Sequence, residues 1–195
     1  MSPTDPFTCQ AHDHHVAVNP TAILRRRHEV ILRALRVIER IGQDLDARHA
    51  VDRSALNCLI EFFRIFADRR HHGKEEQHLF PALELYGIPR QGGPLSVMLR
   101  EHEEGRALLR DMVQGDDHRI AEAIGDYSAL LRAHIDKENR VLFPLAEQVL
   151  PAEQQRALVQ AFEAVERTAA DADVYERLLA QLARLEEAGF GSDKT

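Results

Sequence analysis

The feature of this sequence that most constrains its fold is a duplicated segment in which histidine and glutamate stand four residues apart. The copies are HHGKEEQHLFPALE at 71–84 and HIDKENRVLFPLAE at 134–147, and both follow the pattern H-x-x-K-E-x-x-x-L-F-P. A weaker match relates RRHE at 26–29 to REHE at 100–103. The repeat indicates two helix pairs of similar design, each with one histidine on its first helix and HxxxE on its second.

Apolar residues recur at alternating spacings of three and four across these segments, which is typical of helices with one buried face. The pattern predicts helices over about 20–48, 53–87, 95–114 and from the turn at 115–117 to about 150. Pro81 is expected to kink or end the second of these helices. The short connections between the helices predict an all-α, antiparallel up-down four-helix bundle over residues 20–150.

Two segments flank this bundle. Residues 1–19 are polar and irregular and are predicted to form a flexible tail, which contains Cys9 and three histidines. Residues 151–188 are amphipathic and begin with a proline that suits the first turn of a helix. This C-terminal extension is expected to form additional helices that either cover the bundle or pair with another copy of the chain as a homodimer.

Six ionisable side chains occupy core-facing positions on the four helices: His28, His71, Glu75, His102, His134 and Glu138. A histidine and a glutamate four residues apart lie on one face of a helix, and here that face is the apolar one. Burying an unpaired carboxylate costs several kcal/mol, whereas the net stability of a domain is only about 5–15 kcal/mol. The apolar faces carry no lysine or arginine, so a bound cation is the expected partner.

The donor set limits the choice of cation. Imidazole and carboxylate without thiolate suit iron, manganese or zinc, and six ligands are too many for one tetrahedral zinc ion. Two metals fit better if each receives two histidines and if Glu75 and Glu138 span both, as carboxylates do in the dimetal sites of other bundles. Residue counts also place His28 and His71 at about the same depth in antiparallel helices.

One ambiguity concerns two adjacent pairs with the same spacing. His72 and Glu76 repeat the four-residue interval one position further along the chain. Alignment of the two copies of the repeat favours His71 and Glu75 as the ligands. His72 and Glu76 are therefore expected on the flank of the helix, next to the metals, with solvated side chains.

Two further residues are expected near the metals without binding them. His78 follows Glu75 by one turn on the same face, so it is expected at the rim of the site, with metal binding as the alternative. Tyr127 lies two turns before His134. It is expected to fill the core, and the alternative is that its hydroxyl is a donor close to the metals.

At these residues the sequence resembles the hemerythrin HHE cation-binding family over roughly residues 20–150. The resemblance implies an oxo- or hydroxo-bridged di-iron centre that meets O2, peroxide or NO. The respiratory oxygen carriers of this family have a second histidine on the third helix, four residues after the first, where this chain has Arg106. This departure argues against reversible O2 carriage and favours peroxide or NO chemistry, or redox and iron sensing.

Three functions remain as hypotheses. The first is a non-haem di-iron protein that binds O2, peroxide or NO, or reacts with them, in oxidative or nitrosative stress. The alternative is an iron- or oxygen-sensing module without turnover, in which loss of metal loosens the bundle. The third is a structural bundle with zinc or no metal, in which His71→Ala would leave folding and iron content unchanged.

Composition narrows the expected partners and compartment. The net charge is −7 without a basic stripe, which argues against nucleic acid as a partner. No apolar run reaches the length of a membrane span, and the N-terminal segment lacks the pattern of a signal peptide. Two cysteines, Cys9 and Cys58, stand in no metal-binding spacing. They fit a reducing cytoplasm and are assigned no role.

Overall fold

The computed structural model describes residues 19–166 and 169–190, without the side chains of 169–172 and 190. The tail predicted for residues 1–19, with Cys9 and its histidines, lies outside these residues apart from Asn19 and stays a prediction. Every regular element in the described part of the chain is helical, and π-helical stretches are written η. The elements are α1 (Pro20–Asp46), α2 (Arg53–Phe62), η1 (Phe63–His72), η2 (Glu75–Leu79), α3 (Phe80–Leu85), α4 (Pro94–Gln114), α5 (Asp117–Lys137), η3 (Glu138–Leu142), α6 (Phe143–Val149), α7 (Ala152–Glu166), α8 (Ala169–Leu185) and η4 (Glu186–Phe190).

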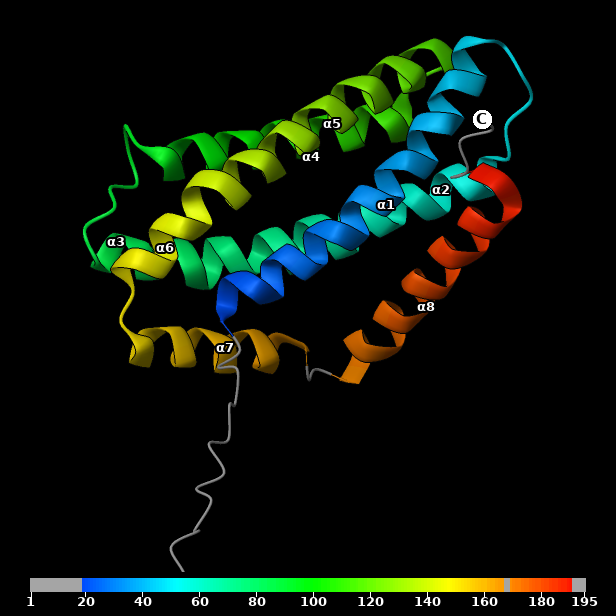
Figure 1. Ribbon diagram of the computed structural model, residues 1–195. Coiled ribbons are helices and arrows are strands. Elements are labelled where there is room, and N and C mark those ends of the chain that lie inside the picture. The colour runs from blue at the N-terminus through cyan, green and yellow to red at the C-terminus, as the bar shows by residue number, and fades with distance from the viewer. Residues whose placement is uncertain (1–18, 167–168, 191–195) are drawn as a thin grey trace, which may run out of the picture.

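Four long helices form the bundle (Figure 1). The segments α2, η1, η2 and α3 follow one another from residue 53 to 85, and α5, η3 and α6 do the same from 117 to 149. Together with α1 and α4 they run alongside one another, and α5 packs against both α1 and α4. The predicted all-α four-helix bundle is confirmed.

Three of the bundle helices begin at a polar residue. The side chains of Asn19, Asp52 and Asp116 accept hydrogen bonds from backbone N–H groups two or three residues later, at 3.1, 2.8 and 2.9 Å. Each side chain satisfies a donor that has no partner within the first turn of its helix. The helix starts predicted near residues 20 and 53 agree with these caps.

Both copies of the repeated motif contain a π-helical turn, η2 or η3, directly before their proline. In the first copy, the N–H of Phe80 reaches the carbonyl of Glu75, five residues back. The next residue, Pro81, has no N–H to place, and the wider turn before it leaves room for its ring. Pro81 therefore does not end the helix, which continues to Leu85.

The apolar core consists of two clusters that are separated along the bundle by the ionisable residues. The larger cluster includes Ile38, Phe63 and Leu131, and the smaller includes Leu24 and Phe143. On three bundle helices the candidate ligands fall between the residues of the two clusters. On the fourth, Glu138 does so, whereas His134 lies next to Ile135 of the larger cluster. The polar centre is thus enclosed by hydrophobic packing on both sides along the bundle axis, which limits the access of water.

The C-terminal extension forms α7 and α8, followed by η4. In Figure 1, α7 lies below the left part of the bundle, where it contacts α1 and η2, and α8 continues below the right part, against α2. Leu158 and Phe162 join the smaller core cluster, whereas Leu178 and Leu182 join the larger one. The extension therefore covers its own bundle, which is one of the two arrangements expected. Pairing with a second copy stays a prediction.

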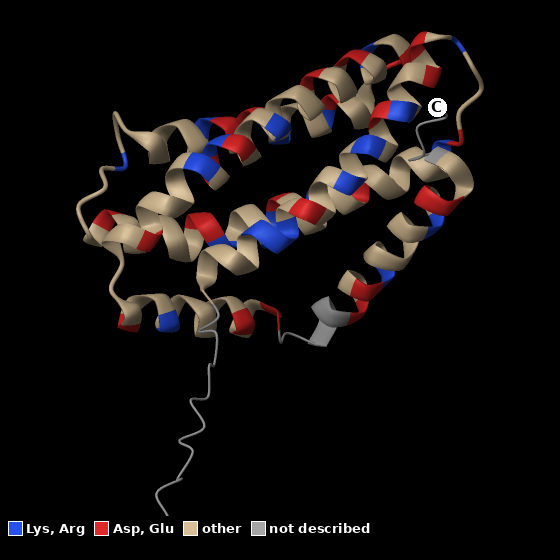
Figure 2. Ribbon diagram, in the orientation of Figure 1, with Lys and Arg blue, Asp and Glu red and all other residues tan. Residues whose placement is uncertain are grey.

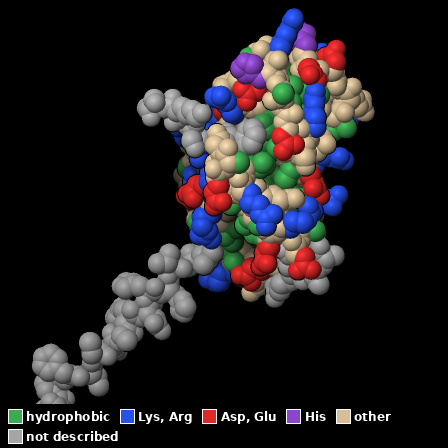
Figure 3. Space-filling model, turned by 90° about the vertical axis from the view of Figure 1, so that its right-hand side faces the viewer, with side chains coloured by type: hydrophobic (Ala, Val, Ile, Leu, Met, Phe, Trp, Pro, Cys, Tyr) green, Lys and Arg blue, Asp and Glu red, His purple; other side chains and the backbone are tan. Residues whose placement is uncertain are grey.

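The surface of the molecule carries charges of both signs. Acidic and basic positions are interspersed along the ribbon (Figure 2), and one face of the molecule shows the same mixture between hydrophobic side chains (Figure 3). Among the described helices, none combines the length and apolar character that crossing a membrane requires.

Candidate metal centre

The four histidines expected to bind metal meet inside the bundle as two pairs. The first pair is His28 of α1 and His71 of η1, whose Nε2 atoms are 2.9 Å apart. The second pair is His102 of α4 and His134 of α5, whose Nε2 atoms are 3.2 Å apart. All four side chains are buried. In each pair the ring nitrogens converge on one point, as ligands of a single ion do.

Two glutamates lie between the histidine pairs. The two oxygens of Glu75 lie 3.5 Å from Nε2 of His71 and 3.6 Å from Nε2 of His102. One oxygen of Glu138 lies 3.1 Å from Nε2 of His28, and its other oxygen lies 3.3 Å from Nε2 of His134. Each carboxylate therefore turns one oxygen toward each pair, which is the orientation that lets a carboxylate bridge two metal ions.

The charges of these carboxylates are not balanced by hydrogen bonds. All four oxygens of Glu75 and Glu138 are buried and lack a hydrogen-bond donor among the described residues. Burial raises the pKa of Glu75 well above its ordinary value, and repulsion from Glu138 adds to this effect. Burial also opposes ionisation of Glu138, but the charge of His134 outweighs it and holds the pKa of Glu138 well below its ordinary value. Ionising both carboxylates at this depth requires added positive charge, so the residues fit a pair of cations.

His72 lies inside the bundle and not on its flank, so the expectation of a solvated side chain is wrong for this residue. The side chain is 5% exposed, and its ring stacks on that of His102 with centroids 3.9 Å apart. One ring nitrogen lies within 4.8 Å of possible ligand atoms on three other residues: Glu75, His102 and His134. Burial, together with the charge of His102, lowers the pKa of His72 to about 3. The imidazole is therefore neutral near pH 7, as a metal ligand must be.

The other residues expected near the metals have separate environments. Glu76 is partly exposed but not a free solvated carboxylate, because its Oε1 lies 2.6 Å from Nδ1 of His102. His78 is partly exposed, and its ring lies 6.2 Å from that of Phe162 in α7, outside both groups of possible ligands. Tyr127 is buried, which raises the pKa of its hydroxyl, and this hydroxyl has no hydrogen-bond partner among the described residues.

The outer nitrogens of the histidines have different partners in the two pairs. In the first pair, Nδ1 of His28 lies 3.0 Å from Oδ1 of Asn139. In the second pair, Nδ1 of His134 lies 2.9 Å from Oε2 of Glu101, and the other oxygen of Glu101, Oε1, accepts from Lys137. Burial opposes protonation of His134, but Glu138 and Glu101 outweigh it and raise its pKa to about 9. A bound cation would be stabilised by the same negative charge.

Three cations lie behind the first pair. Arg27, Arg70 and Lys74 each directly precede a candidate ligand in the sequence, and all three are buried. Their charged groups meet at the carboxylate of Glu166, the last residue of α7, and Arg70 lies 3.4 Å from it. Burial lowers the pKa of Lys74 to about 8. The C-terminal extension therefore contacts the backbone segments that hold the first pair.

Sequence reasoning missed the carboxylates and the amide that lie behind the histidines. Glu101 and Asn139 are each adjacent to a predicted ligand, so a weak signal was present. Neighbours in a helix point in different directions, however, and their partners belong to other helices. Asp68 and Glu166 had no such local signal.

Comparisons with known proteins agree with this geometry. The model of the hemerythrin HHE cation binding domain matches residues 19–146. The iron-sulfur cluster repair protein YtfE of Salmonella paratyphi B is 32% identical over 156 residues, which cover 73% of this chain and 64% of the relative. The uncharacterized protein Rv1995 of Mycobacterium tuberculosis is 27% identical over 165 residues, which cover 77% of this chain and 62% of the relative.

This chain thus spans less than two thirds of the length of these relatives. No solved structure matches it significantly. The family model nevertheless covers well over half of the chain, including every candidate ligand, and the predicted resemblance is confirmed. The chain belongs to the hemerythrin HHE cation-binding family.

Proposed function

We propose that this is a non-haem di-iron protein that binds O2, peroxide or NO, or reacts with them, in the response to oxidative or nitrosative stress. The observation that carries the proposal is the pair of buried carboxylates, Glu75 and Glu138, each with one oxygen toward each histidine pair. The name of the relative YtfE, an iron-sulfur cluster repair protein, supports an iron-dependent role in stress or repair. The metals would be held by His28, His71, His102 and His134, with the two glutamates between them.

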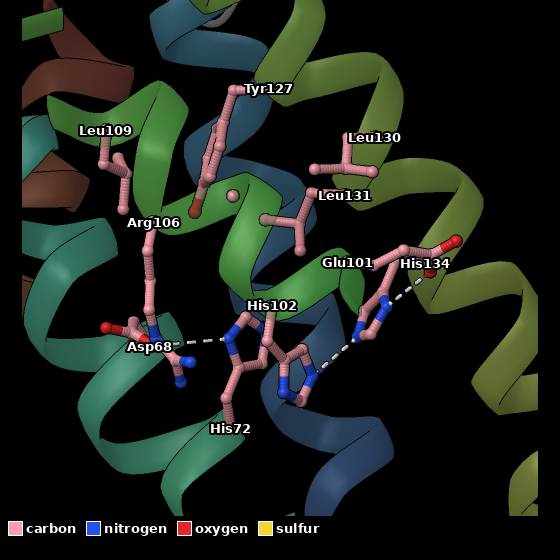
Figure 4. Close-up of a pocket in the computed structure, with 11 residues that line it drawn as sticks. Asp68, His72, Glu101, His102, Arg106, Leu109, Tyr127, Leu130, Leu131 and His134 are labelled. Carbon is pink, nitrogen blue, oxygen red and sulfur yellow. Dashed lines mark hydrogen bonds and ion pairs between the residues drawn. The ribbon is translucent and has the colours of Figure 1, made fainter. Parts of the chain in front are cut away.

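Bound iron supplies Lewis-acid and redox chemistry at positions left open to a small ligand. The chain's own contribution is a small cavity beside the second pair (Figure 4). It is lined by His72, His102 and His134, by the apolar or aromatic side chains of Tyr127, Leu130 and Leu131, and by the charged Asp68, Glu101 and Arg106. Its small size suits a molecule of a few atoms. This supports a diatomic gas or peroxide as the reactant and disfavours a large organic substrate.

The first test is the metal content of the tag-free chain after growth with ample iron, measured by mass spectrometry. About two irons per chain are expected. Zinc, or well under one metal per chain, would overturn the proposal. Two manganese ions per chain would support a dimetal site but contradict the proposal that the metal is iron.

A second test separates binding from turnover. Peroxide consumption by the iron-loaded protein is compared with that of an equal concentration of free iron, and NO binding is followed in the visible spectrum. If peroxide disappears no faster than with free iron, the catalytic form of the proposal fails and ligand binding remains.

Sensing without turnover is the second candidate function, and the contact between α7 and the first pair favours it. Glu166 pairs with the three cations that directly precede His28, His71 and Glu75. A displacement of these candidate ligands would therefore change the ion pairs at the end of α7. Hydrogen exchange of α7 is expected to be faster in iron-free than in iron-loaded protein. Equal protection of α7 in both forms would rule out this route for a signal.

A further inference from the structure

A third imidazole lies beside the second histidine pair, and it comes from an unexpected helix. The position four residues after His102 on α4 holds Arg106 and not a histidine. His72 of η1 instead stacks on His102 at an interplanar angle of 12°, and it meets His134 edge-on with ring centroids 5.5 Å apart. Neither ring nitrogen of His72 has a hydrogen-bond partner among the described residues. A buried imidazole in this state is unusual unless it binds an ion.

The π-helical backbone explains how two consecutive histidines face the same centre. Neighbouring side chains of an α-helix point about 100° apart. A π-helix has more residues per turn, so this angle is smaller, and such stretches are frequent at functional sites. At the end of η1, the ring of His71 faces His28, its partner in the first pair, and the ring of His72 lies beside the second pair. Both rings are buried.

Arg106 connects the two carboxylates that lie behind His72 and His102. Its Nε donates to Oδ1 of Asp68 at 2.7 Å, and its Nη2 donates to Oε1 of Glu76 at 2.6 Å. The same oxygen of Asp68 lies 3.7 Å from Nδ1 of His72, and the same oxygen of Glu76 lies 2.6 Å from Nδ1 of His102. Figure 4 shows Asp68 and Arg106 beside these two rings. One guanidinium thus holds one carboxylate against the outer nitrogen of His102 and a second one beside that of His72, beyond hydrogen-bond distance but near enough to attract its N–H. This arrangement leaves Nε2 of both rings for a metal.

We infer that His72 is the third histidine ligand of the metal held by His102 and His134, in place of the histidine missing at position 106. Arg106 is a positioning residue in this arrangement, because it orients the rings of His72 and His102 through Asp68 and Glu76. The inference rests on the proposed metal centre and extends it. It makes the two metals unequal, with three histidines at one and two at the other.

The test compares His72→Ala and His72→Gln with His78→Ala, a matched control on the same helix outside both groups of ligands. Iron content and the Mössbauer spectrum are measured on the full chain, and circular dichroism checks that each variant is folded. Wild type and His78→Ala are expected to hold about two irons per chain, with two distinct iron signals. Both His72 variants are expected to fall toward about one iron per chain, with loss of the signal of the second site. Added imidazole should restore that signal in His72→Ala.

The outcomes separate this inference from the proposed function. If wild type holds two irons and both His72 variants keep the same content and spectrum, His72 is not a ligand, although the di-iron proposal stands. If wild type holds no iron, the di-iron proposal fails and the inference fails with it. Retention of both irons with no change in His72→Gln alone would also overturn it, because glutamine cannot reproduce imidazole ligation.

Arg106→Lys tests the positioning role. Lysine keeps the positive charge but cannot hold two carboxylates in a planar fork. The Mössbauer signal of the second site is expected to change while that of the first site stays as in wild type. An unchanged spectrum, with normal iron content, would show that Arg106 does not orient the ligands.

Discussion

The two halves of the metal centre are similar in sequence and different in their surroundings. The first pair, His28 and His71, has the neutral amide of Asn139 behind one ring and no hydrogen-bond partner at Nδ1 of the other among the described residues. The second pair and the adjacent His72 face three carboxylates, on Asp68, Glu76 and Glu101. The repeated motif therefore specifies similar ligands but not similar electrostatic environments.

Positively charged residues further from the metals make the electrostatic environments of the two halves still more different. Arg27, Arg70 and Lys74 lie next to the first pair and share the carboxylate of Glu166. A carboxylate behind an imidazole raises its basicity and favours a more highly charged metal, whereas nearby cations disfavour it. We therefore expect the second site to be oxidised more readily than the first.

The largest expected effect follows from Glu138, which serves both halves. Glu138→Gln removes a charge from both metals, so iron content is expected to fall from about two to below one per chain. His28→Ala changes one half and should lose only about one iron. The melting temperature provides a second measurement, because the gap between iron-loaded and iron-free protein should narrow by about 10 °C in Glu138→Gln. Equal losses in the two variants would mean that Glu138 does not bridge.

The next largest effect concerns Glu166 of α7, whose carboxylate pairs with the three cations beside the first half. Glu166→Gln leaves buried cations without their shared negative partner, and it is expected to destabilise the chain by about 2 kcal/mol. The variant should also expose α7 to proteolysis first, while iron at the second site is retained. Normal stability with an intact α7 would show that the contact does not hold the extension in place.

The same contact predicts a dependence on pH. Burial opposes ionisation of Glu166, but Lys74, Arg27 and Arg70 outweigh it and lower its pKa from 4.5. Because the folded pKa lies below the unfolded one, the stabilisation is complete above about pH 4.5 and is lost as the pH falls through the folded pKa. The difference in melting temperature between wild type and Glu166→Gln should therefore be constant near neutral pH and shrink in acid. A constant difference down to pH 3 would contradict this assignment.

A smaller effect is expected from a substitution that makes the charge behind the first pair similar to that behind the second. Asn139→Asp places a carboxylate behind His28, and it is expected to lower the reduction potential of the first site by about 60 mV, the equivalent of one pKa unit. Glu101→Gln is the matched change at the second site and should raise the potential there. Redox titration followed by electron paramagnetic resonance measures both. Shifts of the same sign in the two variants would contradict the comparison.

The smallest effect is expected from a substitution in the helix packing, away from both halves of the candidate metal centre. Gly42 lets α1 approach α5, since an added Cβ would lie 2.9 Å from Cγ2 of Ile124. Gly42→Ala gains helix propensity but crowds a β-branched neighbour, so a net loss of about 1 kcal/mol is expected. Iron content and both iron signals should stay as in wild type. A loss of iron here would mean that metal binding follows global stability and not the local surroundings of each half.

The predicted ligands could be read from the sequence because they depend on local periodicity. A residue four positions from another shares its face in a helix, so the repeat and the apolar face together identified His28, His71, Glu75, His102, His134 and Glu138. The all-α bundle followed from the same spacing. His72 could not be placed in this way, because an α-helical period directs it away from its neighbour. It lies buried at the end of the π-helical segment η1, where consecutive side chains point in more similar directions than in an α-helix.

The side chains that surround the candidate ligands are set by long-range packing. The fork from Arg106 to Asp68 and Glu76 joins residues of two helices, and Glu166 meets Arg27 across 139 positions of the chain. Such contacts depend on how helices pack and not on the spacing within any one of them. The fold and the face that carries the candidate ligands therefore follow from local helical geometry, which a sequence pattern reveals. The unequal charge around the two halves arises from long-range packing, which no local pattern encodes.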